Sequence, residues 1–292
     1  MTPTERNLRN GRRLGASLAF PASIIVLMVM VVPIFMLFRY SFNHFDSSVM
    51  VEGFTFESYV KFFQDPYYRK VFLNTVGVAA VSTVLALVLG FPVAYFLAKS
   101  QSRYKSLFII LLVFPLMVGN VVRAAGWMVI LGNAGFVNFV MQWLGVIDQP
   151  VRLLYTPLAV VVGTTAIVLP YLILTLQSVL EGIDFSVEEA AQNLGASFPT
   201  TFRRIVLPIA APGVAAGTML VFILSMNAYA TPVLLGGSGI TMMAPALYDQ
   251  ITKVSNWPFG SALALVLVTA TLIMALLSSW LIHRRYVKTM AS

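Results

Sequence analysis

Six apolar blocks, each long enough to cross a lipid bilayer as a helix, constrain the fold of this chain more than any other feature. About 20 apolar residues are needed for one crossing. The blocks are Leu18–Phe38, Val71–Ala98, Leu107–Leu131, Thr156–Val179, Ile209–Met226 and Phe259–Ile282. We therefore predict an all-α membrane protein with six transmembrane helices, in which residues 1–292 form a single transmembrane domain in the lipid bilayer.

The composition is that of a membrane protein and not of a soluble one. Hydrophobic residues make up 59% of the 292 residues and charged residues only 10%, whereas soluble domains carry about 25% charged residues. The basic N-terminus precedes an apolar run that is too long for a cleaved signal peptide and has no small-x-small cleavage site after it. We therefore expect a retained first helix. The absence of cysteine excludes disulfides and thiolate metal sites.

The basic residues predict the orientation, because Lys and Arg collect in cytoplasmic segments of membrane proteins. With the N-terminus inside, 12 of the 19 Lys and Arg residues lie in cytoplasmic segments, and 7 lie outside or near an outer helix end. We therefore predict that both termini are cytoplasmic and that the polar segment of residues 181–208 faces the cytoplasm. The net charge of +8 reflects this topology, and we expect no nucleic-acid partner.

Residues 188–208, EEAAQNLGASFPTTFRRIVLP, form a polar stretch between two apolar blocks. Ser186 and Glu189 have the spacing of a capping box, which predicts a helix over residues 187–194. Gly195 follows, where a helix commonly ends in the left-handed conformation, and Ser197 is placed to cap a second helix. The pattern predicts a short, rigid helix–glycine–helix elbow. Its small apolar face is formed by residues one turn apart, namely Ala190, Ala191 and Leu194.

The same stretch resembles the signature of permease subunits of binding-protein-dependent ABC importers, which is E-A-A, three residues, G, nine residues and I-x-L-P. The matching residues are Glu189, Ala190, Ala191, Gly195, Ile205, Leu207 and Pro208, with Glu188 directly before them. The resemblance implies the type I ABC importer permease fold, with a coupling helix that docks in a groove of an ATPase subunit. It also implies a multi-pass protein of the bacterial cell (inner) membrane. We call residues 181–208 the coupling segment.

The resemblance implies further subunits. A permease of this kind works with a second, homologous permease, with two ATPase subunits and with an extracytoplasmic substrate-binding protein. The chain contains no G-x-x-x-x-G-K-[ST] phosphate loop, so ATP and Mg are expected on the partner ATPase, and no cofactor or metal is expected on this chain. The chain is then not an enzyme itself, and it transports its solute by alternating access.

Two further segments bear on the solute. VRAAGWMVILGNAGFVN and MNAYATPVLLGG look like segments of the spermidine/putrescine permeases, which implies polyamine transport. Importers of other small organic solutes share such segments, so an amino-acid derivative, an opine or a phosphonate is the alternative. A polyamine is a polycation, yet no carboxylate lies inside a predicted span. Either aromatic faces and amide oxygens hold the cation, with acids supplied by the partner permease, or the solute is not a polyamine.

Polar residues near the spans are candidates for the solute pathway, since such residues are rare in lipid. Asn120, Arg123 and Trp127 are spaced i, i+3 and i+7 and therefore share one helix face. Asn227 and Tyr229 lie at the outer end of the fifth span. Each residue also has a plainer interpretation. Arg123 can reach the interface, Trp127 can belong to the interfacial aromatic belt, and the other two can bond between helices.

Two other classes of function fit the sequence poorly. An intramembrane enzyme needs a nucleophile with a base, or a metal cluster, but the only histidines are His44 and His283, and no H-E-x-x-H motif is present. A passive channel needs no ATPase and leaves the coupling segment unexplained. An importer permease is therefore the predicted function, with the channel and the enzyme as the alternatives from other classes.

Overall fold

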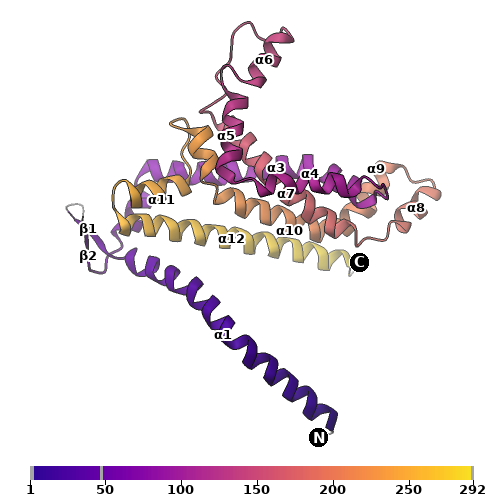
Figure 1. Cartoon of the computed structure of the whole chain (residues 1–292), viewed down its shortest axis with the longest axis horizontal. Helices are drawn as coiled ribbons and strands as arrows, with labels where there is room; N and C mark the ends of the chain where they lie inside the picture. Colours follow the sequence, from indigo (N-terminus) through magenta and orange to yellow (C-terminus); the bar gives the residue numbers. More distant parts are fainter. Residues whose placement is uncertain (1–2, 47–48, 291–292) are drawn as a thin grey trace.

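The structure, a computed structural model, describes residues 3–46 and 49–290 and is built mainly of long helices (Figure 1). In chain order the elements are α1 (Pro3–Tyr40), β1 (His44–Asp46), β2 (Val49–Val51), α2 (Glu57–Gln64), α3 (Pro66–Lys99), α4 (Lys105–Met117), α5 (Asn120–Leu131), α6 (Phe136–Trp143), α7 (Pro157–Leu180), α8 (Ser186–Asn193), α9 (Phe198–Thr201), η1 (Phe202–Val206), α10 (Leu207–Met226), η2 (Pro232–Gly236), α11 (Met243–Thr252) and α12 (Trp257–Met290). The elements η1 and η2 are short π-helical turns. The predicted helical membrane fold is confirmed in these residues.

Six helical segments among the described residues are long and apolar enough to cross a membrane, as predicted. A helix satisfies its own backbone hydrogen bonds, which lipid cannot do. The segments are Ser23–Tyr40, Pro66–Lys99, Asn120–Trp143, Pro157–Leu180, Phe198–Met226 and Trp257–Leu277. Each overlaps one of the predicted blocks, but the third is displaced toward the C-terminus.

The third predicted span, Leu107–Leu131, is wrong as a single helix. The chain forms α4 and then α5, with extended backbone at Val118 (ψ 130°) and Gly119 (ψ 145°) between them. Glycine is a poor helix former because the unfolded chain has more freedom at this residue, and Pro115 in the last turn of α4 has no backbone N–H to bond the preceding turn. An apolar run therefore does not by itself report where a helix breaks.

The centre of the bundle is the packing of α3, α7 and α10, which run side by side (Figure 1). Its buried core comprises Ala86, Phe91, Ala94, Leu97, Val168, Leu172, Ile173, Leu176, Leu180, Ala210 and Val221. Glycines let α10 approach α7 closely, because a Cβ at Gly213 would lie 2.5 Å from Val179 Cγ1 and one at Gly217 would lie 2.9 Å from Leu172 Cδ1. Small residues of this kind permit tight packing between membrane helices.

The two ends of the bundle differ. One end carries α8 and α9, the opposite end carries the β1–β2 hairpin and α11, and α5 and α6 project sideways from the bundle between the two ends (Figure 1). The hairpin is antiparallel, with His44 opposite Val51, and it is the one departure from all-α structure among the described residues. Helix α2 follows the hairpin and buries Phe62 against Tyr68 and Phe259 of the bundle. The coupling segment is thus separated from the hairpin by the length of the bundle.

Helix α1 points away from the bundle (Figure 1). Its apolar window, Ser23–Tyr40, has none of its residues buried within the chain. The first span therefore leaves a long apolar face open to lipid or to another helix.

Candidate functional site

The coupling segment has the predicted bend. Helix α8 ends at Asn193, and Gly195 adopts a positive φ of +89°. Two hydrogen bonds close the helix end, from the Gly195 amide to the Gln192 carbonyl (2.9 Å) and from the Ala196 amide to the Ala191 carbonyl (3.0 Å). This pair is the Schellman pattern, which needs a left-handed residue and therefore favours glycine. The predicted helix stop at Gly195 is confirmed.

The predicted capping box at the start of this helix is wrong. Ser186 is the first residue of α8 and not the residue before it, and no side chain caps the helix from the N-cap position. The carboxylate of Asp184 instead accepts a hydrogen bond from the Ser186 amide at 2.9 Å. That hydrogen bond holds the pKa of Asp184 below its ordinary value. Asp184 thus satisfies the first free amide of α8 in place of the predicted Ser186–Glu189 capping box, because its side chain reaches the amide two residues ahead.

The second arm of the bend continues into the membrane helix. Ser197 is the N-cap of α9, as predicted, but its hydroxyl bonds the Thr200 hydroxyl (2.9 Å) and not a backbone amide. Helix α9 passes through η1 into α10, and Phe198–Met226 forms one apolar helical stretch of 29 residues. Within this arm Ile205 is half-buried, whereas Leu207 and Pro208 are exposed at the start of α10. A displacement of α9 is therefore passed directly to a transmembrane helix.

One side of the coupling segment is open and apolar. Leu194 is 90% exposed, and Val187, two turns before it on the same face of α8, is about half exposed. Ala190 and Glu189 are also exposed, whereas Ala191 is half-buried. The predicted apolar face is thus present, with Ala191 turned partly inward. An apolar patch on a polar segment outside the bundle is typical of a surface that binds another protein.

The opposite side of the coupling segment is held to α3 through Glu188. Its carboxylate is 2% exposed and receives hydrogen bonds from Lys99 Nζ (2.8 Å), from the Tyr95 hydroxyl (2.6 Å) and from Gln192 Nε2 (3.1 Å). Burial raises the pKa of Glu188, but the hydrogen bonds from Lys99 and Tyr95 outweigh burial and hold the pKa below its ordinary value. The carboxylate is therefore charged and fully paired.

Sequence reasoning included Glu188 with the motif but missed its partners. Lys99 and Tyr95 lie 89 and 93 residues earlier in the chain, at the end of an apolar block where a basic residue predicts only topology. One local signal was available, since Glu188 and Gln192 are one helical turn apart. Nothing local indicates that α3 supplies the cation.

An aromatic cluster packs beside this ion pair. The Tyr95 ring lies at 6.0 Å from the rings of Phe185 and Phe202 and at 6.4 Å from that of Phe198. Lys99 Nζ lies over the rings of Tyr95 and Phe185, at 5.7 and 5.6 Å from their centroids. Edge-to-face aromatic pairs of this kind stabilise a contact by about 0.5–1.5 kcal/mol each beyond the burial of area. Both arms of the coupling segment are thus packed against one residue of α3.

A second ion pair joins the start of the coupling segment to α4. Lys105 Nζ lies 2.7 Å from Glu181 Oε1, and Gln177 Nε2 donates to the same carboxylate at 3.0 Å. The hydrogen bond from Lys105, followed by that from Gln177, lowers the pKa of Glu181. Both groups of this ion pair are partly open to solvent, where such a pair contributes little to stability.

A polar pocket of about 360 Å³ lies near the other end of the bundle. Its lining residues are Asn120, Val121, Thr164, Ile167, Val168, Tyr171, Leu224, Asn227, Ala228, Tyr229, Ala230 and Thr231. The fold thus brings together three of the five predicted pathway residues, Asn120 from α5 with Asn227 and Tyr229 from the chain just after α10. The described residues that line it include no carboxylate, so the pocket presents amides, hydroxyls and aromatic rings to a solute.

The other two predicted pathway residues do not line this pocket. Arg123 donates hydrogen bonds to the Ile167 carbonyl (3.3 Å) and to the side-chain oxygen of Asn120, so its guanidinium is bonded to two of the lining residues. Trp127 packs instead into the apolar cluster that contains Leu131 and Leu235. Arg123 is therefore adjacent to the pocket, and Trp127 belongs to the core near it.

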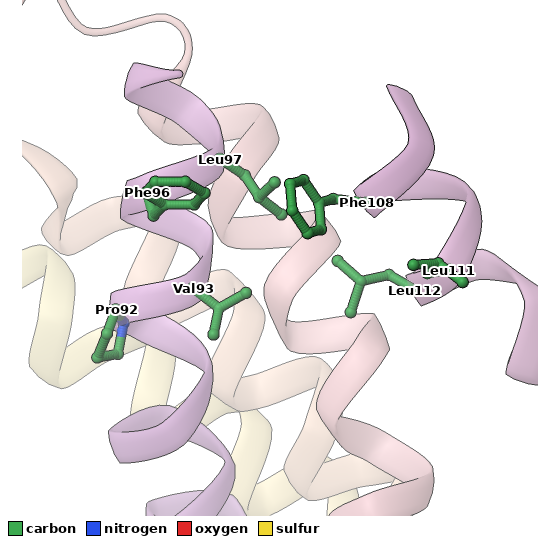
Figure 2. A pocket seen from close by; sticks show the side chains of 7 residues that line it. All are labelled: Pro92, Val93, Phe96, Leu97, Phe108, Leu111 and Leu112. Carbon is green, nitrogen blue, oxygen red and sulfur yellow. The ribbon is translucent and has the colours of Figure 1, made fainter. Parts of the chain in front are cut away.

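A second hollow, of about 430 Å³, lies between α3 and α4 (Figure 2). Its lining residues are Pro92, Val93, Phe96, Leu97, Phe108, Leu111 and Leu112. Figure 2 shows Val93 and Leu97 of α3 facing Phe108 and Leu112 of α4 across the gap. Every lining side chain is apolar, so this hollow offers a solute no charged or hydrogen-bonding side chain.

Comparisons with known proteins agree with this architecture. The chain is 36% identical over 232 residues to the spermidine/putrescine transport system permease protein PotB of Escherichia coli (strain K12), covering 80% of this chain and 83% of that protein. It is 34% identical over 223 residues to PotB of Haemophilus influenzae, covering 76% and 77%. A crystal structure of a bacterial ABC transporter that imports the acidic polysaccharide alginate has the same fold, with a TM-score of 0.77, 17% identity and coverage of 97% and 99%.

The family follows from a match that covers most of the chain. Residues 82–286 fit the family model described as the binding-protein-dependent transport system inner membrane component. The matched range contains the whole coupling segment, four of the six apolar helical segments in full and the second half of α3. The chain therefore belongs to the family of inner membrane components of binding-protein-dependent transport systems, as a multi-pass permease subunit.

Proposed function

We propose that this chain is one permease of an ATP-driven importer that carries polyamines such as spermidine and putrescine by alternating access. The observation that carries the proposal is the open apolar face of the coupling segment, on an arm that continues as a helix into α10. A rigid arm transmits a displacement that a flexible loop would absorb. The identity to spermidine/putrescine permeases over four fifths of the chain supports the choice of solute.

The proposed assembly contains four further subunits. A second permease completes the pathway, two ATPase subunits bind the coupling segments and hold ATP and Mg, and an extracytoplasmic binding protein delivers the solute. The exposed apolar face of α1 supports a neighbouring permease within the bilayer. In this assembly both termini and the coupling segment face the cytoplasm, as the basic residues predict.

In this proposal the polar pocket is the part of the solute pathway that this chain lines. Tyr229 and Tyr171 offer aromatic faces, and Asn120 and Asn227 offer amide oxygens. An aromatic face attracts a desolvated cation by about 0.5–2 kcal/mol, which guides a polycation without trapping it. The partner permease supplies the carboxylates that this pocket lacks, and the binding protein supplies tight selection.

Competition for uptake tests the solute. Proteoliposomes that hold the complete complex are given labelled spermidine, with ATP inside, against excess putrescine or against acidic opines and phosphonates. Because the guanidinium of Arg123 is engaged by Ile167 and Asn120, we expect putrescine to compete, acidic solutes to have no effect, and Arg123→Ala to keep this preference.

The opposite pattern overturns the polyamine proposal. If acidic solutes compete, polyamines do not, and Arg123→Ala abolishes the preference, the solute is an anion that Arg123 recognises. Uptake that continues at the same rate without ATP contradicts the importer and supports a passive channel.

A further inference from the structure

The coupling segment is joined to the bundle by side chains as well as by its two ends. Lys99 and Lys105 flank the turn between α3 and α4, and their partners, Glu188 and Glu181, both belong to the coupling segment. The N–O distances are 2.8 and 2.7 Å. In both ion pairs the cation belongs to α3 or α4 and the anion belongs to the coupling segment. The two pairs therefore connect the coupling segment to the same part of the bundle.

The Lys99–Glu188 pair is the stronger of the two connections. Glu188 is 2% exposed, and Tyr95 and Gln192 fill its remaining acceptor positions. A buried carboxylate that loses its partner cannot recover the lost interaction from water, so it resists separation. Glu181, by contrast, is 40% exposed and can exchange Lys105 for water at little cost.

Helix α3 reaches from this contact to the far end of the bundle. With 34 residues it is about 51 Å long. Near its other end Asn74 Nδ2 donates to the Thr241 carbonyl (3.2 Å), and the Thr75 hydroxyl accepts from the Met243 amide (2.8 Å). If the coupling segment displaces α3, the displacement therefore reaches Thr241 and Met243, which follow the pocket-lining residues in the chain.

We propose that Lys99 and Glu188, with Tyr95, form a strut that makes α3 move together with α8 when a partner ATPase displaces the coupling segment. The strut is a second route of coupling beside the continuous arm of α9 and α10. This inference rests on the proposed function, because it needs an ATPase to displace the segment. The three residues are positioning residues, and none of them contacts ATP or solute.

The test separates transport from ATP hydrolysis in proteoliposomes that hold the complete complex. Glu188→Gln keeps the size of the side chain and removes its charge, Lys99→Met removes the cation, and Tyr95→Phe removes only one hydroxyl. Allosteric coupling commonly amounts to about fivefold or more. We expect spermidine imported per ATP hydrolysed to fall about fivefold in the first two variants and less in Tyr95→Phe.

Charge exchange and a matched control make the test specific. Lys99→Glu combined with Glu188→Lys restores the pair in reverse, so we expect a higher ratio of import to hydrolysis than in either single reversal. Lys253→Met removes another Lys–carboxylate contact of 2.8 Å, to Asp249 at the opposite end of the bundle, and should leave the ratio unchanged. The amount of complex recovered from membranes is measured for every variant.

Failure of the strut and failure of the coupling segment give different results. If Glu188→Gln and Lys99→Met keep the wild-type ratio while Leu194→Glu on the open face lowers it, the strut is wrong and the coupling segment stands. If Leu194→Glu also leaves import and hydrolysis unchanged, the proposed function of the segment is wrong. A reversed pair that is no better than the single reversals, at equal recovery, also overturns the strut.

Discussion

At the scale of single residues, two neighbouring acids in the coupling segment have opposite surroundings. Glu188 is buried and bonded to Lys99, Tyr95 and Gln192, whereas Glu189, one residue later, is exposed. Successive residues of a helix point about 100° apart, so one acid turns to α3 and the other to solvent. Glu189, the acid that belongs to the family motif, is the exposed one. Its side chain can therefore contact a partner subunit.

Gly195 is the residue on which the bend depends. Its φ of +89° is unfavourable for any side chain, although no atom lies within 4 Å of a Cβ placed there. Gly195→Val should therefore destabilise the bend by about 1–2 kcal/mol through backbone strain alone. We expect ATP-dependent uptake to be lost while the protein still inserts in the membrane.

Gly145 provides the matched control. It also has a positive φ, of +69°, with no atom within 4 Å of its Cβ position, but it follows α6 and lies outside the coupling segment. Gly145→Val should keep uptake near the wild-type rate. Normal uptake by Gly195→Val would contradict the coupling role of the bend.

At the scale of elements, the close packing of α7 and α10 fixes the geometry that the coupling segment acts on. Gly213 lies against Val179, and Gly217 lies against Leu172. Because α10 continues from the second arm of the coupling segment, its position against α7 decides how a displacement reaches the polar pocket, to which both helices contribute. Small residues at this interface are therefore structural.

Gly213→Val tests this packing. The new Cβ would lie 2.5 Å from Val179 Cγ1, and overpacking of this kind costs about 1–3 kcal/mol. We expect a lower thermal-unfolding temperature of the detergent-solubilised protein, measured by fluorescence. Val179→Ala in the same chain should recover part of the loss. Gly77→Val on α3, where no atom lies within 4 Å, should have little effect, and an equal loss there would contradict the packing argument.

At the scale of the whole molecule, the coupling segment leads into the start of α10, whereas the polar pocket is lined by residues at and after the other end of α10. Helices α8 and α9 of the coupling segment lie at one end of the bundle (Figure 1). This separation suits a permease in which ATP is used on one side of the membrane and solute enters from the other. It also makes the orientation of the chain decisive. If the coupling segment faced outward, no cytoplasmic ATPase could reach it.

Because the chain has no cysteine, single introduced cysteines can report this orientation. Gln101 lies between α3 and α4, Ser238 follows η2, and both are exposed. We expect a membrane-impermeant maleimide to label Ser238→Cys in intact cells and to label Gln101→Cys only after the inner membrane is permeabilised. The reverse pattern would place both termini outside and refute the proposed topology.

The sequence by itself determined the features that depend on local chemistry. Six apolar runs predict six spans, because crossing the bilayer requires only sufficient length and hydrophobicity of the segment itself. Gly195 was predicted as the bend because positive φ is a property of one residue. The family was recognisable because the motif from Glu189 to Pro208 is contiguous. None of these features requires knowledge of a neighbour in space.

Only the tertiary structure decided the features that depend on which segments meet. The partner of Glu188 is 89 residues away in sequence, and the engagement of Arg123 by the Ile167 carbonyl spans 44 residues. Trp127 shares a helix face with Asn120 two turns earlier in α5, yet it packs in the core while Asn120 lines the pocket, because different elements meet the two ends of α5. The partners of these side chains depend on how elements distant in the sequence pack together, and no local sequence pattern reports that packing.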